Sequence, residues 1–125
     1  MIMKRTPLIV LILALMGGVM VSCTYDEIKP KKIDVPTVVS FSTDVIPIFN
    51  AKCNMTGCHS AGGQPPNLTS QNAYTSLTFY GYVDLVDPQA SIIYQKITTG
   101  TMKQHASDQD RAIILKWIEQ GANND

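Results

Sequence analysis

The segment CNMTGCH, residues 53–59, constrains the fold of this 125-residue chain more than any other. Cys53 and Cys58 enclose four residues, and His59 follows the second cysteine directly. Positions five apart in sequence lie roughly 140° apart around an α-helix. The two thiols therefore cannot act on one group from a regular helix. The chain between them must bulge, and Asn54 and Gly57 both tolerate the backbone angles of such a bulge.

The residues alone leave three interpretations of this segment open. In an exported protein, Cys53 and Cys58 would form a small disulfide beside an uninvolved histidine. A zinc site is barely possible, because the two cysteines and the two histidines would have to supply all four ligands. The third interpretation is covalent haem attachment, whose usual run, C-x-x-C-H, has two fewer residues between the cysteines. Cys58 and His59 are adjacent as in that run, so the half that places an iron ligand is unchanged.

The first residues have the three-part plan of an export signal. Lys4 and Arg5 precede an apolar run over residues 8–21, and Ser22 and Cys23 follow. This plan predicts a signal peptide at residues 1–22. The apolar run is shorter than the ~20 residues of a usual membrane span, and an uncleaved anchor is the alternative.

The end of this signal, MVSC at residues 20–23, resembles the lipobox of bacterial lipoproteins. The resemblance implies cleavage before Cys23 and lipidation of that cysteine, and several acyl chains on one residue anchor a protein stably. Residues 23–37 are polar and contain Pro30 and Pro36, and we interpret them as a tether. The folded domain is predicted at residues 38–125, on an exported, membrane-anchored protein that faces the periplasm or the cell surface.

The charge is nearly balanced, with ten basic and ten acidic side chains in the whole chain. Without residues 1–22, which contain two of the basic side chains, the balance is eight against ten, a net charge of about −2. There is no basic stripe, so no nucleic-acid partner is predicted. The sequence shows no nucleophile, general base or substrate pocket, so we expect neither an enzyme nor a small-molecule substrate.

The sequence predicts four helices and no sustained strand, which is an all-α fold. The first is expected at residues 44–52, capped by Thr43 or Asp44 so that Pro47 lies in the first turn. The second is expected at residues 71–77, with Ser70 as the cap. Residues 81–86 could form a short extended piece.

The third helix is expected at residues 88–97, capped by Asp87 with Pro88 at the favoured first position. The fourth helix has the clearest signals. Ser107 and Asp110 have the spacing of a capping box, and Gly121 is expected to end the helix. Its apolar stripe is formed by Ile113, Ile114, Trp117 and Ile118.

Residues 41–125 resemble a small class I cytochrome c domain, most closely those of exported bacterial lipoproteins. In these, a stretch like FSTDVIPIFNAKCNMTGCH opens the domain and one like ILKWIEQGA closes it. The resemblance implies a small cytochrome c-like fold of about four helices around one covalent haem c. Cys53 and Cys58 would hold the haem, and His59 would be the proximal axial ligand of the iron. Phe49 lies where the family places an aromatic on its first helix, and that helix would cross the last one near Trp117.

The resemblance also implies the surroundings of the iron. The run PPNL at residues 65–68 resembles one in which a proline carbonyl accepts a hydrogen bond from the axial histidine, a role that falls to Pro66. Met102 is the expected second axial ligand and His105 the alternative to it, with an open position as a third arrangement. From the sequence alone, Met102 could instead fill a gap in the core.

The function that this resemblance implies is one-electron transfer between protein redox partners, which the sequence does not identify. One alternative is a structural or interaction lipoprotein without haem, stapled by a Cys53–Cys58 disulfide. Another is a haem sensor with an open sixth position.

Overall fold

The computed structural model describes residues 31–125, and within them the chain is helical, with four α-helices and no strand. The α-helices are α2 (Ile46–Lys52), α3 (Ala73–Phe79), α4 (Ile92–Thr98) and α5 (Asp108–Glu119). Three shorter turns join them: η1, a π-helix (Phe41–Val45), and the 3-10 helices η2 (Pro88–Ala90) and η3 (Lys103–His105). The all-α class is confirmed, and residues 81–86, where the sequence allowed a short extended piece, form no strand. The predicted signal peptide and Cys23 lie outside the described residues.

The first helix begins earlier than predicted. Ser40, not Thr43 or Asp44, is the N-cap of η1, and η1 continues directly into α2. The Asp44 carboxylate instead accepts a 2.8 Å hydrogen bond from the Ser40 N–H. The wide π-turn explains how Pro47 lies inside a continuous helix, because in a regular helix its ring would clash with the carbonyl four residues earlier.

The next two helices differ from prediction in their starts. Helix α3 begins after Asn72, because the Thr69 carbonyl accepts from the N–H groups of Asn72 and Ala73, whereas the Ser70 hydroxyl bonds to Asn50. The helix expected at residues 88–97 is split at Ser91 into η2 and α4. The Asp87 carboxylate caps η2 as predicted, accepting from the Ala90 N–H at 3.3 Å.

Ser91 causes this break. The residue is 1% exposed, and its hydroxyl accepts from the Asp84 N–H and donates to the Asp84 carbonyl. Its extended ψ of 129° separates the two helical pieces.

Helix α5 agrees with the prediction at both ends. Ser107 and Asp110 form the reciprocal capping box. At the other end Gly121 has a φ of +99°, and the N–H groups of Gly121 and Ala122 bond to the carbonyls of Ile118 and Trp117. These two bonds are those of a Schellman motif, in which glycine avoids the strain of a left-handed conformation.

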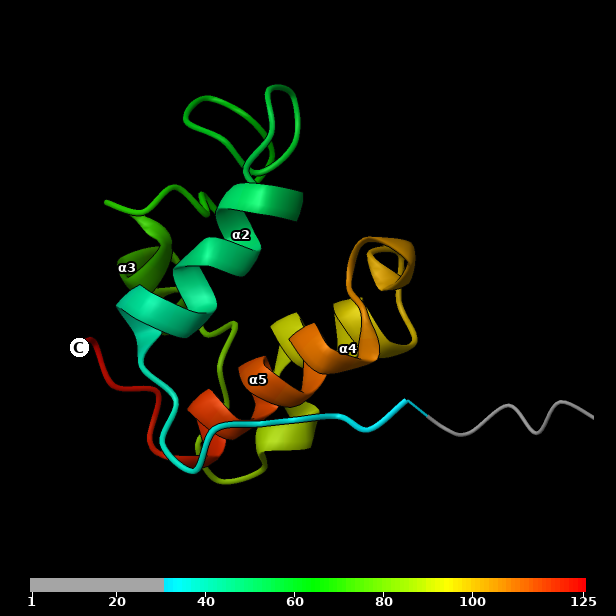
Figure 1. Cartoon of the computed structure of the whole chain (residues 1–125). Coiled ribbons are helices and arrows are strands. Elements are labelled where there is room, and N and C mark those ends of the chain that lie inside the picture. The colour runs from blue at the N-terminus through cyan, green and yellow to red at the C-terminus, as the bar shows by residue number, and fades with distance from the viewer. Residues whose placement is uncertain (1–30) are drawn as a thin grey trace, which may run out of the picture. The chain divides into compact units, whose positions relative to one another are not determined.

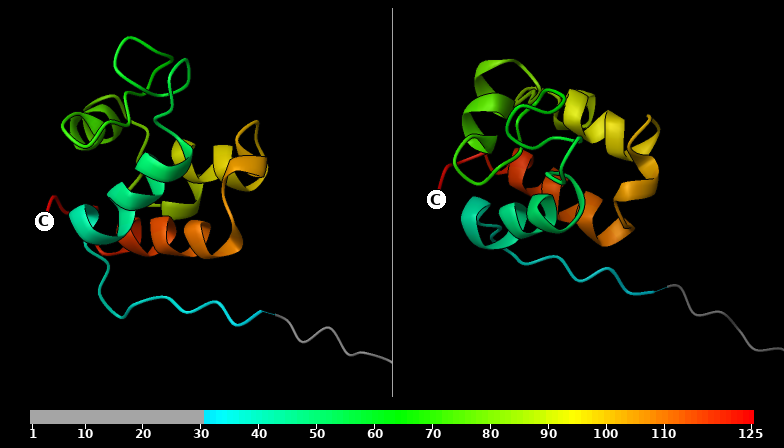
Figure 2. Two further views of the ribbon diagram at one scale, coloured as in Figure 1. Left: turned by 45° about the horizontal axis from the view of Figure 1, so that its top comes forward. Right: turned by 90° about the horizontal axis from the view of Figure 1, so that it is seen from above.

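The core forms where η1 and α2 cross α5, and α4 packs along α5 on the other side (Figure 1, Figure 2). The Phe41 ring lies 4.9 Å from the Trp117 ring, centroid to centroid, and meets Tyr74 edge-on at 5.5 Å. Phe41 is thus the aromatic whose ring lies, tilted, against Trp117. Phe49 contacts Phe41 from the side and is also buried.

The chain ahead of the first helix is attached to α5. The side-chain amide of Gln109 bonds to both the N–H and the carbonyl of Asp34, and the Gln120 amide oxygen accepts from the Val39 N–H at 3.0 Å. This segment and all the helices belong to one compact unit, residues 32–125. Within residues 31–125, none of the helices combines the length and the apolar character that crossing a membrane requires.

Candidate functional site

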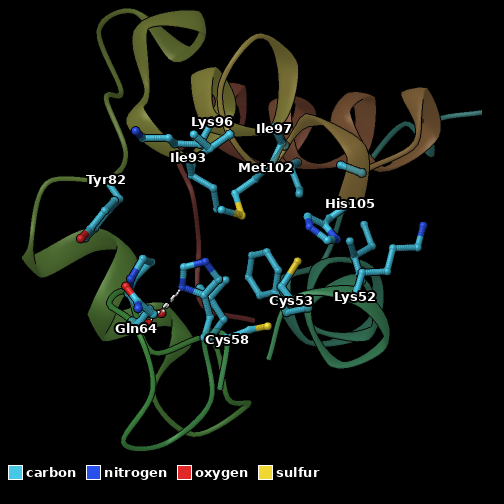
Figure 3. A pocket seen from close by; sticks show the side chains of 18 of the residues that line it. Lys52, Cys53, Cys58, Gln64, Tyr82, Ile93, Lys96, Ile97, Met102 and His105 are labelled. Carbon is cyan, nitrogen blue, oxygen red and sulfur yellow. Dashed lines mark hydrogen bonds between the residues drawn. The ribbon is translucent and has the colours of Figure 1, made fainter. Parts of the chain in front are cut away.

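A cavity of about 510 Å³ lies between the C-terminal end of α2, the segment after it, α4 and the chain around η3 (Figure 3). Its volume is within the range of ~300–1,000 Å³ that is usual for cofactor and ligand sites. The wall is mostly apolar, with Ile48, Phe49, Leu68, Ile93, Ile97 and Ile114 among the lining side chains. All six residues expected at the haem also line it: Cys53, Cys58, His59, Pro66, Met102 and His105.

The expected bulge between the two cysteines is present. Helix α2 ends at Lys52, and Cys53 is its C-cap. Gly57 has a φ of +81°, which a glycine adopts without strain, and the Cys58 N–H bonds to the Met55 carbonyl at 2.9 Å. The His59 N–H then reaches back to the Cys53 carbonyl at 3.1 Å. The turn therefore returns the chain beside Cys53, and both cysteines line one cavity although they do not share one helix.

Cys53 and Cys58 are free thiols in the structure, and their exposure differs. Cys58 is exposed, whereas Cys53 is half-buried with its sulfur on the cavity side (Figure 3). Burial raises the pKa of the Cys53 thiol to about 11, and the nearby Asp110 carboxylate adds to the rise. Cys53 is thus held as a neutral thiol, a small apolar group in an apolar wall.

His59 is oriented by two backbone carbonyls. Its Nδ1 lies 3.1 Å from the carbonyl oxygen of Pro66 and 3.1 Å from that of Gln64. Since a carbonyl can only accept, Nδ1 carries a proton, which leaves Nε2 as the ring nitrogen that a metal would bind. The Pro66 contact is the one that the PPNL resemblance implies. Gln64 was not anticipated, because nothing in the sequence shows which way its carbonyl points.

Met102 and His105 approach the cavity from the opposite wall. Met102 precedes η3 and His105 ends it, so they are three residues apart on a 3-10 turn, where such side chains lie on the same side. Met102 is half-buried and its side chain points into the cavity, whereas His105 is exposed and lies at one end of the cavity (Figure 3). A methionine thioether thus lies across the cavity from the attachment segment.

The charged groups that line the cavity in the described part of the chain are two lysines, Lys52 and Lys96. Lys52 forms an ion pair with Asp110, whose side chain is only one-tenth exposed. Burial opposes ionisation of Asp110, but hydrogen bonds from Lys52 and Ser107 outweigh it and lower its pKa. The sequence did not indicate this pair, because 58 residues separate its partners.

The side chains that could hold a cofactor gather in this cavity. Residues 31–125 contain no group of three or more His, Cys, Asp or Glu side chains that could hold a metal ion. The cavity instead combines an apolar wall with two thiols, one oriented imidazole and one thioether. A flat apolar group that brings its own equatorial iron ligands would need only such axial and covalent partners from the chain.

Comparisons with known proteins identify no relative: no protein-family model, no curated protein and no solved structure matches this chain.

Proposed function

We propose that this chain is a membrane-anchored c-type cytochrome that carries one covalent haem and transfers single electrons between protein partners. Its domain would have a small cytochrome c-like fold, and a lipid on Cys23 would hold it to a membrane after export. The haem supplies the one-electron redox step when bound. The chain would hold and shield the haem, and we propose no catalytic residue and no small-molecule substrate.

The observation that carries the proposal is the convergence of both thiols, His59 and Met102 on one cavity. His59 and Met102 are far apart in sequence yet line the same cavity, as two axial ligands of one haem iron would have to. The hydrogen bonds to the Pro66 and Gln64 carbonyls orient the His59 ring and would make it a more electron-rich ligand.

Each residue has a separate role in this proposal. Cys53 and Cys58 would form the two thioether bonds, and Nε2 of His59 would bind the iron. Met102 would take the sixth position, where thioether ligation raises the reduction potential relative to bis-histidine ligation. His105 is exposed at the end of the cavity and is the alternative to Met102.

The test is covalent haem content after expression of the full chain with c-type maturation machinery. The protein is denatured, extracted with acidified acetone and assayed as the pyridine haemochrome. We expect one haem per chain, with the spectrum of a haem attached through two thioethers. If no haem stays with the denatured protein, and Cys53 and Cys58 react with thiol reagents only after reduction, the proposal is refuted. The chain would then be a lipoprotein stapled by a Cys53–Cys58 disulfide.

Matched variants identify the sixth ligand. We expect Met102→Ala to abolish the weak far-red band of ferric haem with methionine ligation and to make the reduced form bind CO. Met55→Ala is the control, because Met55 lies within the attachment segment but is exposed. CO binding by the unmodified protein would instead favour a sensor with an open position, and loss of ligation in His105→Ala would favour histidine.

A further inference from the structure

Arg111 on α5 connects three elements around the wall that carries Met102. Its Nε donates to the Ile97 carbonyl in α4, and one terminal nitrogen donates to the Lys103 carbonyl in η3, each at 2.7 Å. The other terminal nitrogen pairs with the Asp108 carboxylate at 2.6 Å. The Arg111 side chain is 18% exposed. Its bond to the Ile97 carbonyl is partly buried, whereas its bonds to Lys103 and Asp108 are exposed.

The two carbonyls flank the segment that presents Met102. Residues 99–107 connect α4 to α5, and the Arg111 side chain bonds to the backbone in the last turn of α4 and again within this segment. The segment's other backbone bonds are short-range: the Met102 N–H bonds to the Lys96 carbonyl, and the His105 N–H bonds to the Met102 carbonyl, both at 3.0 Å. These bonds shape the turn but do not attach it to α5.

Local helix energetics do not explain an arginine at this position. Arg111 is the fourth residue of α5, where a positive charge is unfavourable to the helix dipole. Its ion pair is with Asp108, whose side chain is 76% exposed, and exposed pairs contribute little to stability. The two backbone contacts remain as the reason for the guanidinium, whose planar fork of donors can bond several acceptors at once.

We infer that Arg111 is a positioning residue that holds Met102 at the distance and orientation needed to bind the haem iron. This inference rests on the proposed function. Arg111 itself does not line the cavity, and its three hydrogen-bond partners include none of the proposed haem ligands. It acts by fixing both the end of α4 and the start of η3 to α5, the helix that also packs against η1 and α4.

The test compares Arg111→Met and Arg111→Lys with Lys103→Met. The control removes a positive charge from the same segment but keeps the backbone carbonyl to which Arg111 donates. Hydrogen exchange is measured on the full-length protein as isolated. In both Arg111 variants we expect the amides of residues 103–105 to exchange about tenfold faster or more, because at least one charge-assisted hydrogen bond is lost. Lys has one ammonium group and cannot bond all three acceptors, so it should not restore protection.

The second readout is ligation of the haem. Arg111→Met and Arg111→Lys should keep covalent haem but lose much of the far-red band of the ferric form and gain a CO-binding fraction when reduced. Lys103→Met should keep the band. Unchanged exchange at residues 103–105, or an intact far-red band in both Arg111 variants, would overturn the inference.

The two readouts separate this inference from the proposed function. If the unmodified protein retains no haem, the proposed function fails, and with it the ligand-positioning role. If it retains haem and shows the far-red band, while the Arg111 variants behave as Lys103→Met does, the function stands and only the role of Arg111 is refuted.

Discussion

Replacing Asp110 with alanine should destabilise the domain more than any other single change at an ion pair of the described residues. The Asp110 side chain is one-tenth exposed, and one oxygen, Oδ2, accepts from the N–H and the hydroxyl of Ser107 at 2.7 Å each. The same oxygen accepts from the Lys52 ammonium. This carboxylate thus closes the capping box of α5 and also ties α5 to the end of α2, beside Cys53.

The two contributions differ in size. A capping interaction contributes about 1 kcal/mol, and a hydrogen bond to a charged group about 1.5–3 kcal/mol. Lys52 is 39% exposed, so water screens its ion pair, and exposed pairs contribute only about 0.2–1 kcal/mol. We therefore expect Asp110→Ala to cost roughly 2–3 kcal/mol, with the larger part from Ser107. Lys52→Met should cost less than about 1 kcal/mol.

Urea unfolding of the two single variants and the double variant measures these terms at pH 7. The coupling energy of the double-mutant cycle should be at most about 1 kcal/mol. For a domain of this size, the Asp110→Ala loss corresponds to a fall in Tm of roughly 10–20 °C. If Lys52→Met costs as much as Asp110→Ala, the ion pair dominates and the reasoning from capping is refuted.

The pH dependence gives an independent check. The pKa of Asp110 is lower in the folded state than its ordinary value of 3.8. Its charge therefore stabilises the fold fully above that value, and the stabilisation is lost as the pH falls toward the folded-state pKa. The difference in the free energy of unfolding between the unmodified protein and Asp110→Ala should be constant from about pH 5 to 8. It should become smaller below about pH 4. A difference in unfolding free energy that grows on acidification would contradict the sign of this linkage.

Three further predictions concern single positions. Gly121→Ala should lower the free energy of unfolding by about 1 kcal/mol, because alanine is strained at a φ of +99°. Urea unfolding of both proteins at the same pH measures this difference, and an unchanged free energy would argue against the Schellman motif at the end of α5. Ser91→Ala should cost about 1–3 kcal/mol, since the Asp84 N–H would lose its partner; a loss under 0.5 kcal/mol, about that of an ordinary surface change, would refute this. In the haem-free protein, burial raises the pKa of the Cys53 thiol to about 11. This thiol should therefore react with iodoacetamide at about pH 8 far more slowly than a model thiol, and its reaction rate should rise toward about pH 11. A rate equal to that of the model thiol would refute the burial of Cys53.

Short-range signals in the sequence predicted part of the candidate site. Cys58 and His59 are consecutive residues, so the sequence alone places them side by side. The need for a bulge after Cys53 follows from helix geometry. The orientation of His59 was predicted only through the resemblance of PPNL to a known run. The second carbonyl partner, from Gln64, depends on how the loop folds back, which no pattern within residues 59–68 specifies.

The long-range features of the site could not be predicted in the same way. Lys52 and Asp110 belong to different helices, and Arg111 reaches carbonyls whose residues carry no sequence mark of that role. Backbone carbonyls are identical in every residue, so only the tertiary structure shows which of them accepts from a guanidinium. Sequence patterns therefore missed the ion pair beside Cys53. They also missed the hydrogen bonds from Arg111 to the Ile97 and Lys103 carbonyls, on either side of Met102.

The sequence by itself determined the all-helical class and both ends of α5, because a capping box and a glycine C-terminal motif are hydrogen bonds among residues only a few positions apart. Only the tertiary structure decided where the first helix begins and where the third one breaks. The first helix extends back to Ser40, where Asp125, from the far end of the chain, accepts from the Phe41 and Ser42 N–H groups. It also decided that Met102 faces the thiols across one cavity, because that arrangement depends on packing between segments some forty residues apart.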